Sequence, residues 1–298
     1  MMQTLTDIGA AGGKNRFETI PGIPELTDRD FGLFQEMIRR ESGIYLSSGK
    51  KALLIARLRR RLRELGLTSM AAYYRYVVEE GEQERTRMLD CICTNETRFF
   101  RETQHFQFLE QRVFPAWLKE WAAGERKQIR VWSAGCSTGE EAYSLAMMLY
   151  EYFPADPAGS IDILATDIST RALDAARAGV WPRARSEEIP ARYLKRFMLR
   201  GTGSQEGKMK AGRAIRSVIK FHRLNLNDTT YPVAGPFDLI LCRNVLIYFH
   251  VLSKARAINR LLDRLSPKGY LLLGHAESLH RLTDRVRNIA PAIYAHAR

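Results

Sequence analysis

The sequence predicts an α/β protein in which a parallel sheet, covered by helices on both faces, follows an all-helical module. In the second part of the chain, short apolar runs alternate with helical stretches, as they do in parallel sheets. These runs read IRVWSAG, IDILATD, FDLILCRNV and GYLLLGH. Before Ile129 there is no strand pattern, and apolar residues recur at helical spacing instead.

The composition is typical of a soluble globular protein with room for two domains. The chain has 298 residues, of which 45% are apolar and 27% are charged. No apolar run approaches the roughly 18 residues that span a bilayer, and the start of the chain lacks a secretory signal pattern. We therefore expect no membrane insertion. The net charge of +13 favours an anionic partner, without choosing among nucleic acid, a membrane surface and an acidic protein.

The cysteines indicate free thiols rather than a disulfide framework. Cys91, Cys93, Cys136 and Cys242 form no paired CxxC motif, and no histidine stands at zinc-ligand spacing from them. So few cysteines in so long a chain are typical of a reducing compartment. We therefore expect a cytoplasmic protein without a metal site.

The helical module is expected to cover residues 25–93. Residues 1–24, rich in Gly, Ala, Thr and Pro, are expected to form a mobile tail before it. Thr27 or Asp28 can cap a first helix, and Gly43 can close it.

A second helix begins near Ser48 and turns a stripe of leucines inward. The stripe consists of Leu54, Leu58, Leu62 and Leu65. The segment 50–63 of this helix contains seven basic residues and no acidic one. Two more helices are expected at residues 70–78 and 82–93. The module should therefore contain four helices and a strongly basic surface.

In the α/β region, one stretch interrupts the alternation of strands and helices. The expected helices cover residues 140–153, 170–179 and 252–265. Between Pro182 and Phe221 the chain is rich in glycine and contains short β-prone pieces such as RSVIKFH. We interpret the second half of this stretch, about residues 190–222, as a small inserted β-structure.

The segment VWSAGCSTGEE is the best candidate for a ligand site, because it reads as a strand, a glycine turn and a helix. Gly135 and Gly139 let a ligand approach the backbone of the turn closely. Ligands of open parallel sheets bind beyond the carboxyl ends of the strands. The next strand ends in Asp167, which is placed to accept hydrogen bonds from both hydroxyls of a ribose. This arrangement predicts a nucleoside cofactor.

Several interpretations of this turn compete. A dinucleotide fits poorly, because the turn reads G-x-x-x-G and two acids would face the pyrophosphate. A serine hydrolase is possible, since Ser137 lies in a G-x-S-x-G match and Asp238 and His275 follow in order. However, Asp238 precedes its strand and should lie at the opposite end of the sheet. The cationic, phosphate-free S-adenosylmethionine suits Glu140 and Glu141, and a packed turn without a ligand also stays open.

Further motifs show a family resemblance. TNETRFFRE, VWSAGCSTGEEAYSLA, LATDIS, NLND, FDLILCRNVLIYF and GHAES occur in this order. Together they resemble the CheR family, the chemoreceptor glutamate O-methyltransferases, over residues 26–294. The resemblance implies a Rossmann-like S-adenosylmethionine-dependent methyltransferase domain at residues 107–298, with a small inserted antiparallel β-subdomain. It also implies a linker, residues 94–106, that contributes to the cofactor site.

The resemblance, with Gly135 of the glycine turn, also predicts the site residues. The expected cofactor contacts are Asn95, Thr97, Arg101, Gly135, Glu140, Asp167, Asn225, Leu226, Arg243 and Asn244. Arg101 and Tyr248 resemble the residues nearest the transferred methyl group. Phe99 and Phe100 of the same motif are expected in the core. Where many relatives carry Pro the chain has Ala142, and both residues suit an early helical position.

The activity that the resemblance implies is methyl transfer from S-adenosylmethionine to glutamates of bacterial chemoreceptors, the methyl-accepting chemotaxis proteins. S-adenosylhomocysteine would be the product. A glutamate carboxylate, with a pKa of about 4.3, is already ionised at pH 7 and needs no catalytic base. The sulfonium is a built-in leaving group, so the enzyme mainly has to align the reactants and exclude water.

The expected partner is the helical methylation region of a chemoreceptor, docked on the basic second helix. Arg59, Arg60 and Arg63 should project away from the leucine stripe. The segment 200–207, RGTGSQEG, resembles a loop of the family's β-subdomain that can bind a receptor C-terminal peptide, and its use here stays open. The basic run has no interleaved aromatic residues, so no nucleic acid is expected.

Two other functions stay open at this point. One is a nucleic-acid methyltransferase, which the net charge suggests. The other is a non-catalytic module that binds S-adenosylmethionine and signals through partners.

Overall fold

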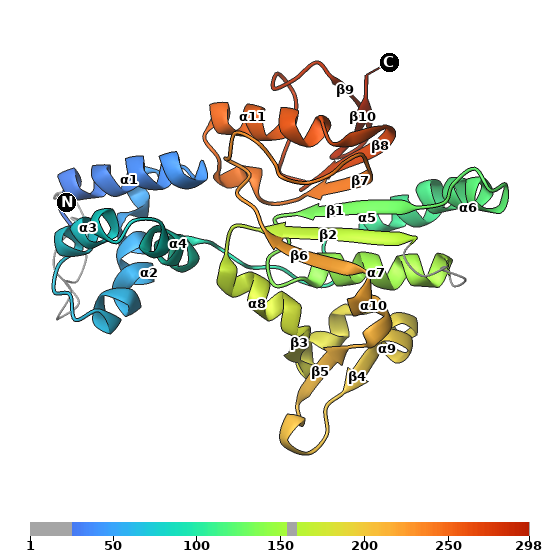
Figure 1. Ribbon diagram of the computed structural model, residues 1–298, viewed down its shortest axis with the longest axis horizontal. Helices are drawn as coiled ribbons and strands as arrows, with labels where there is room; N and C mark the ends of the chain where they lie inside the picture. Colours follow the sequence, from blue (N-terminus) through green and yellow to red (C-terminus); the bar gives the residue numbers. More distant parts are fainter. Residues whose placement is uncertain (1–25, 154–159, 298) are drawn as a thin grey trace, which may run out of the picture.

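The computed structural model describes residues 26–153 and 160–297, which form a helical domain and an α/β domain (Figure 1). The expected tail at residues 1–24 lies outside the described residues. The predicted fold class, a largely parallel sheet with helices on both faces behind an all-helical domain, is confirmed. None of the described helices combines the length and apolar character that a membrane span requires.

Four helices form the N-terminal domain, as the periodicity predicts. They are α1 (Asp28–Ser42), α2 (Lys51–Glu64), α3 (Met70–Glu79) and α4 (Glu82–Ile92). The Thr27 side chain accepts a hydrogen bond from the Asp30 N–H and so caps α1, and Gly43 ends α1 in the left-handed conformation. Within the core, the buried Glu84 carboxylate accepts a bond from Tyr73 and pairs with Arg61 at 2.6 Å.

The leucine stripe of α2 packs inward and leaves a basic face outside. Leu54, Leu58 and Leu62 are buried in the core of the helical domain. On the other side, Arg60 and Arg63 are exposed. The predicted basic surface is therefore accessible to a partner.

A seven-stranded sheet organises the second domain. Its strands are β1 (Ile129–Ala134), β2 (Ile161–Asp167), β6 (Ile219–Arg223), β7 (Phe237–Cys242), β8 (Leu265–Leu273), β9 (Val286–Ala290) and β10 (Ile293–His296). They are arranged in the order β6-β2-β1-β7-β8-β10-β9. The first five strands of this order are parallel, and β10 is antiparallel to β8. The chain leaves β1 to one side for β2 and later to the other side for β7, so β1 marks the topological switch point.

Alternating residues of the strands supply two separate cores, because successive side chains point to opposite faces of a sheet. Val131 and Leu239 belong to one core, whereas Trp132 and Ile240 belong to the other. The first core includes residues of α5 (Thr103–Phe108), η2 (Leu109–Val113), α6 (Phe114–Ala122), α7 (Glu140–Tyr152) and α8 (Thr170–Ala178). The second includes residues of α11 (Val251–Leu262).

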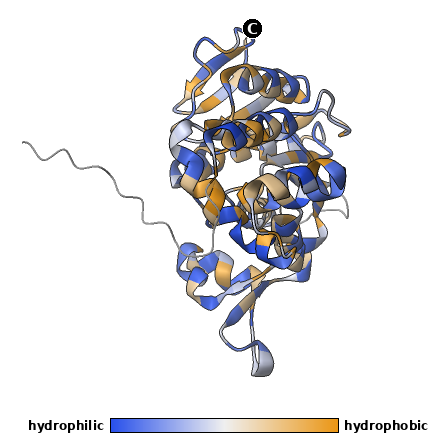
Figure 2. Cartoon of the chain, turned by 90° about the vertical axis from the view of Figure 1, so that its left-hand side faces the viewer, coloured by the Kyte–Doolittle hydropathy of each residue, from blue (hydrophilic) through white to orange (hydrophobic). Residues whose placement is uncertain are grey.

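A small antiparallel sheet forms an arm that projects from the main body in both views (Figures 1 and 2). It consists of β3 (Val180–Pro182), β4 (Met198–Arg200) and β5 (Lys208–Ala211), with β5 in the centre. The helices α9 (Ala191–Phe197) and α10 (Arg213–Ser217) accompany it.

The limits of this inserted unit differ from the expected residues 190–222. Its first strand begins at Val180, and Ile219–Arg223 pairs with β2 in the large sheet instead. Short β-prone segments do not specify their partner strand, because register and sheet membership depend on contacts distant in the sequence.

Candidate functional site

A cavity of about 390 Å³ lies where the carboxyl ends of β1, β2 and β7 face the helical domain and the linker. This volume is typical of small-molecule sites, and the position follows the rule for open α/β sheets. Ten of the eleven residues predicted for the site line this cavity. They are Asn95, Thr97, Arg101, Gly135, Asp167, Asn225, Leu226, Arg243, Asn244 and Tyr248.

The glycine turn and Asp167 form the floor of the cavity. Gly135 has a φ of +85°, and a Cβ atom there would lie 2.4 Å from Val245 Cγ2, so only glycine fits. Asp167 Oδ2 accepts a hydrogen bond from the Ser137 N–H at 2.8 Å, and Oδ1 accepts one from the Ser169 N–H at 2.9 Å. Because each carboxylate oxygen has a second lone pair, Asp167 can still accept two hydroxyl groups. Burial raises the pKa of Asp167 above its usual value.

The structure distinguishes the paired glutamates at the start of α7. Glu140, the eleventh predicted residue, does not line the cavity. It is fully buried and accepts a hydrogen bond from Thr138 Oγ1 at 2.6 Å. Its Oε1 atom lies 3.4 Å from Arg185 Nη2. Glu141 lines the cavity instead. Glu141 accepts a hydrogen bond from Ser133 Oγ at 2.6 Å, and burial raises its pKa. Which of two adjacent helical residues faces a site depends on the rotation at Gly139, which has a φ of +95°.

A buried guanidinium joins this glutamate to the linker. The Arg243 Nη1 atom lies 3.2 Å from Glu141 Oε2, and Nη2 lies 3.0 Å from Glu102 Oε2. Arg243 Nη2 also donates to the backbone carbonyl of Arg101. The guanidinium therefore fixes the linker residue Arg101 against the sheet, a role that the sequence did not reveal.

Glu277 supports the next stretch of backbone. Its carboxylate accepts hydrogen bonds from the N–H groups of Gly274, Asn244 and Ile247, at 2.7, 2.8 and 3.1 Å. Asn244 is held at a φ of +58°, a conformation that few residues other than glycine adopt. Two of these partners, Asn244 and Ile247, lie 33 and 30 positions away in the sequence, so no local pattern points to this role of Glu277.

Side chains of the α/β domain hold the backbone of the linker in place. Phe99 N–H donates to Glu188 and Phe100 N–H donates to Ser144 Oγ, and both phenyl rings are buried, as expected. Asn95 Oδ1 is buried and has no hydrogen-bond partner within the described residues. An unpaired buried acceptor beside a cavity is suited to a ligand that donates a hydrogen bond.

The mouth of the cavity is more exposed and carries several cations. Within the described residues, the Arg101 side chain makes one hydrogen bond, to the Glu96 carbonyl at 3.1 Å, and Tyr248 is 38% exposed. Lys50 and Arg98 also line the cavity, and neither makes a side-chain hydrogen bond or ion pair with a described residue. The mouth can therefore attract an anionic group.

Asn225 connects the two domains beside the cavity. Its Nδ2 donates to the Glu41 carbonyl at 2.6 Å, and its Oδ1 accepts from the Asn227 N–H. The Tyr45 N–H donates to the Tyr248 carbonyl at 2.7 Å. Contacts between the helical and α/β domains thus border the cavity.

The hydrolase interpretation does not agree with this geometry. Ser137 Oγ donates to the Asn95 carbonyl at 2.8 Å rather than to a histidine. Asp238 accepts from the Arg130 N–H at the opposite, amino edge of the sheet, as its place in the strand predicts. The serine has no triad partners within the described residues.

Comparisons with known proteins agree with the two-domain division. The all-alpha domain of the CheR methyltransferases matches residues 29–93, and their SAM binding domain matches residues 95–294. Chemotaxis protein methyltransferase 2 of Pseudomonas aeruginosa is 39% identical over 91% of this chain and 94% of its own length. The chemotaxis protein methyltransferase of Escherichia coli is 35% identical over 91% of both chains.

The solved structures add little to these matches. The glycopeptide N-methyltransferase MtfA complexed with S-adenosyl-L-methionine gives a TM-score of 0.32, with 14% identity over 58% of this chain and 55% of that chain. A similarity this low supports no conclusion beyond those above.

Proposed function

The chain belongs to the CheR methyltransferase family, and we propose from this that it esterifies glutamate side chains of bacterial chemoreceptors. Its cofactor is S-adenosylmethionine, and its activity is methyl transfer in chemotaxis. The observation that supports the finer proposal best is the cavity itself. Its floor is acidic, with Asp167 buried and the Glu141 side chain 13% exposed, whereas its mouth carries Lys50 and Arg98, which have no ion-pair partner among the described residues and can attract an incoming carboxylate.

The residues present fit this cofactor. Asp167 stands at the carboxyl end of β2 with lone pairs left to accept the ribose hydroxyls, and Gly135 also lines the cavity. Glu141, rather than Glu140, would face the ammonium group, and Asn95 Oδ1 offers a buried acceptor. When bound, the cofactor supplies a methyl group on a sulfonium, which is cationic and carries no phosphate. An acidic floor suits that charge.

The residues of the mouth would bind and orient the substrate. Arg101 would steer the glutamate carboxylate, which is ionised at pH 7 and needs no proton removed. Tyr248 would hydrogen-bond near the reacting centre through its partly exposed hydroxyl. Arg243 would act by holding Arg101 in place, because it contacts the Arg101 carbonyl and two carboxylates rather than open space.

The substrate would be a helix that carries acidic and apolar residues. Exposed apolar side chains of both domains surround the mouth, namely Tyr45, Leu53, Ile247 and Tyr248. The basic face of α2, with Arg60 and Arg63 exposed and Arg59 half-buried, belongs to the same helix as Leu53. Opposite charge favours docking of an acidic receptor helix on this side. We also propose a cytoplasmic location, in agreement with the free thiols of all four cysteines.

Transfer of a labelled methyl group tests this function. Membranes with overproduced chemoreceptor, incubated with the full chain and methyl-labelled S-adenosylmethionine, should gain label that mild base releases as methanol. Membranes without receptor, and a receptor whose methylation-region glutamates are changed to alanine, are the controls. Label in nucleic acid, base-stable label, or cofactor binding without transfer would each contradict the proposal.

A further inference from the structure

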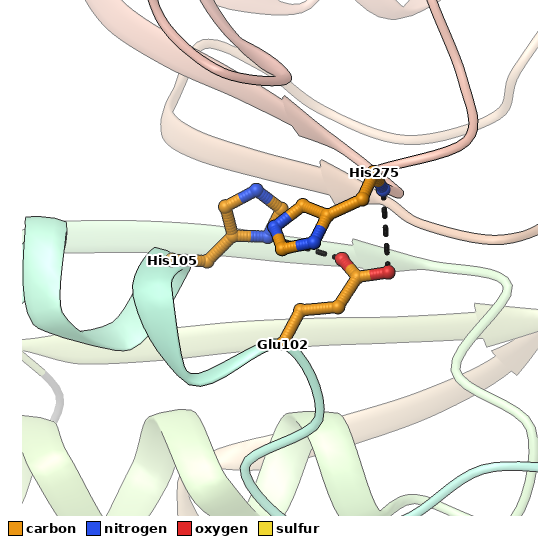
Figure 3. A group of neighbouring side chains, drawn as sticks. All are labelled: Glu102, His105 and His275. Carbon is orange, nitrogen blue, oxygen red and sulfur yellow. Dashed lines mark hydrogen bonds and ion pairs between the residues drawn. The ribbon is translucent and has the colours of Figure 1, made fainter.

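A cluster of two histidines and a glutamate lies beside the cavity, apart from the residues assigned to the cofactor. Glu102 immediately precedes α5 in the left-handed conformation, and His105 lies in the first turn of that helix, with His105 Nδ1 3.4 Å from Glu102 Oε2. His275 follows the carboxyl end of β8, 170 positions after His105 in the sequence, and its side chain lies beside the other two. The ligand atoms of the three side chains all lie within 4.8 Å of one another (Figure 3).

The ring nitrogens of His105 have only weak partners among the described residues. The side chain is 1% exposed, and neither Nδ1 nor Nε2 makes a hydrogen bond of normal geometry there. Its Nδ1 lies 3.4 Å from Glu102 Oε2, its ring contacts the ring of His275 at a centroid distance of 4.8 Å, and the backbone of Pro291 also interacts with it. A buried imidazole with such weak partners gains from a ligand that binds a lone pair of the ring.

The local charge also suits a cation. Two carboxylates, Glu102 and Glu141, share the single guanidinium of Arg243. When both are ionised, the group carries one surplus negative charge. Arg243 attracts Glu102 away from the histidines, so an ion would have to compete with this pair.

We propose that Glu102, His105 and His275 form a binding site for a divalent ion of the zinc class. Two imidazoles and one carboxylate are a donor set that suits zinc, cobalt or nickel rather than magnesium or calcium. Water would complete the coordination on the side where His275 is exposed. This site departs from the expectation, drawn from cysteine spacing, that the chain has no metal site.

The ion would be coupled to the cofactor cavity through Glu102. This carboxylate also accepts a hydrogen bond from Asn244 Nδ2 at 3.2 Å and pairs with Arg243, and both residues line the cavity. An ion that draws Glu102 toward the histidines would loosen both contacts. Binding of the ion and of S-adenosylhomocysteine should therefore affect each other reciprocally.

Cobalt absorption and zinc calorimetry on the full chain, with any histidine tag removed, test the site. The wild type should bind one equivalent, with cobalt bands typical of nitrogen and oxygen ligands. His275→Ala should weaken binding at least tenfold, because His275 is exposed and its loss should spare the fold. His280→Ala, which removes another exposed histidine of the same loop, should bind as the wild type does.

Three outcomes would overturn the proposal: no binding at millimolar metal, equal binding by His275→Ala, or thiolate-to-cobalt absorption that points to the cysteines. The affinity for S-adenosylhomocysteine, measured with and without zinc, should shift in the wild type and not in His275→Ala. An unchanged affinity in the wild type would refute the coupling. These measurements involve no methyl transfer. Their outcome is therefore independent of whether the proposed function is correct.

Discussion

The cavity has two walls of opposite construction. The wall at the sheet edge is buried and acidic: Asp167 is 8% exposed, and its oxygens are already held by backbone N–H groups. The wall from the helical domain is open, basic and partly apolar, with Tyr45 56% exposed and Lys50 without an ion-pair partner in the described part of the chain. The linker, with Arg101, lies where the two walls meet.

The two walls are therefore suited to different tasks, namely binding one fixed ligand and binding a variable protein partner. A site for one fixed ligand gains from side chains that are held in place before binding, since little ordering is left to do. A surface for a variable protein partner gains from exposed charges and apolar side chains that can adapt. We therefore expect changes in the sheet wall to affect the cofactor, changes in the helical wall to affect the receptor, and Arg101 to affect turnover.

The largest effect is expected at Arg101, where the two walls of the cavity meet. Arg101→Ala should lower kcat by about 100-fold or more, because it removes the charge that steers the carboxylate. The affinity for S-adenosylhomocysteine, measured by calorimetry, should change by no more than about threefold. Arg112→Ala, which removes an exposed cation that does not line the cavity, is the matched control and should leave kcat unchanged. If Arg101→Ala mainly weakened cofactor binding, Arg101 would belong to the sheet wall.

The next effect tests the sheet wall. Asp167→Asn should weaken binding of S-adenosylhomocysteine about 10- to 100-fold, since hydrogen bonds to a charged acceptor are each worth about 1.5–3 kcal/mol. Glu140→Gln should change it far less, because Glu140 does not line the cavity. Equal losses in the two variants would show that the cavity does not hold the nucleoside as proposed.

Reversing charge on the basic face of α2, outside the cavity, should have a smaller effect. Arg59→Glu with Arg63→Glu should raise the KM for receptor membranes about 5- to 10-fold at low salt, and less at high salt, because exposed charges are screened. Cofactor affinity should stay unchanged. Lys127→Glu with Lys268→Glu, two exposed lysines at the amino edge of the sheet, should leave the KM as it is. A KM insensitive to the α2 change would place docking elsewhere.

The smallest effect concerns pH. Because burial raises the pKa of Asp167, its carboxylate begins to protonate at a higher pH than an exposed aspartate. The neutral form accepts hydroxyl hydrogen bonds less well, so affinity for S-adenosylhomocysteine should fall a few-fold as pH is lowered from 7.5 toward 5. Titration calorimetry at each pH measures this. An equal decline in Asp167→Asn would assign the titration to another group.

Much of this organisation follows from local sequence. The cap at Thr27 and the left-handed Gly43 gave the limits of α1, and apolar runs located β1, β2, β7 and β8. The position of Asp167 at the cavity followed from strand polarity alone.

Contacts between residues distant in the sequence account for the features that the sequence did not predict. The Ile219–Arg223 segment joins the large sheet through β2, and no local pattern distinguishes that pairing from one in the small sheet. That Glu141 rather than Glu140 lines the cavity depends on the rotation of α7 at Gly139. The meeting of Glu102 with His275 depends on the whole fold between them.

The contact between Ile44 and Phe249 has one more consequence. These residues form an isolated antiparallel bridge, flanked by hydrogen bonds from the amides of Tyr45 and His250 to carbonyls of the other domain. A hinge motion that parts the two domains would break these bonds together. The hydrogen-exchange rate of the two amides would then report how often the cavity opens. Comparing that rate with kcat would show whether product release limits turnover.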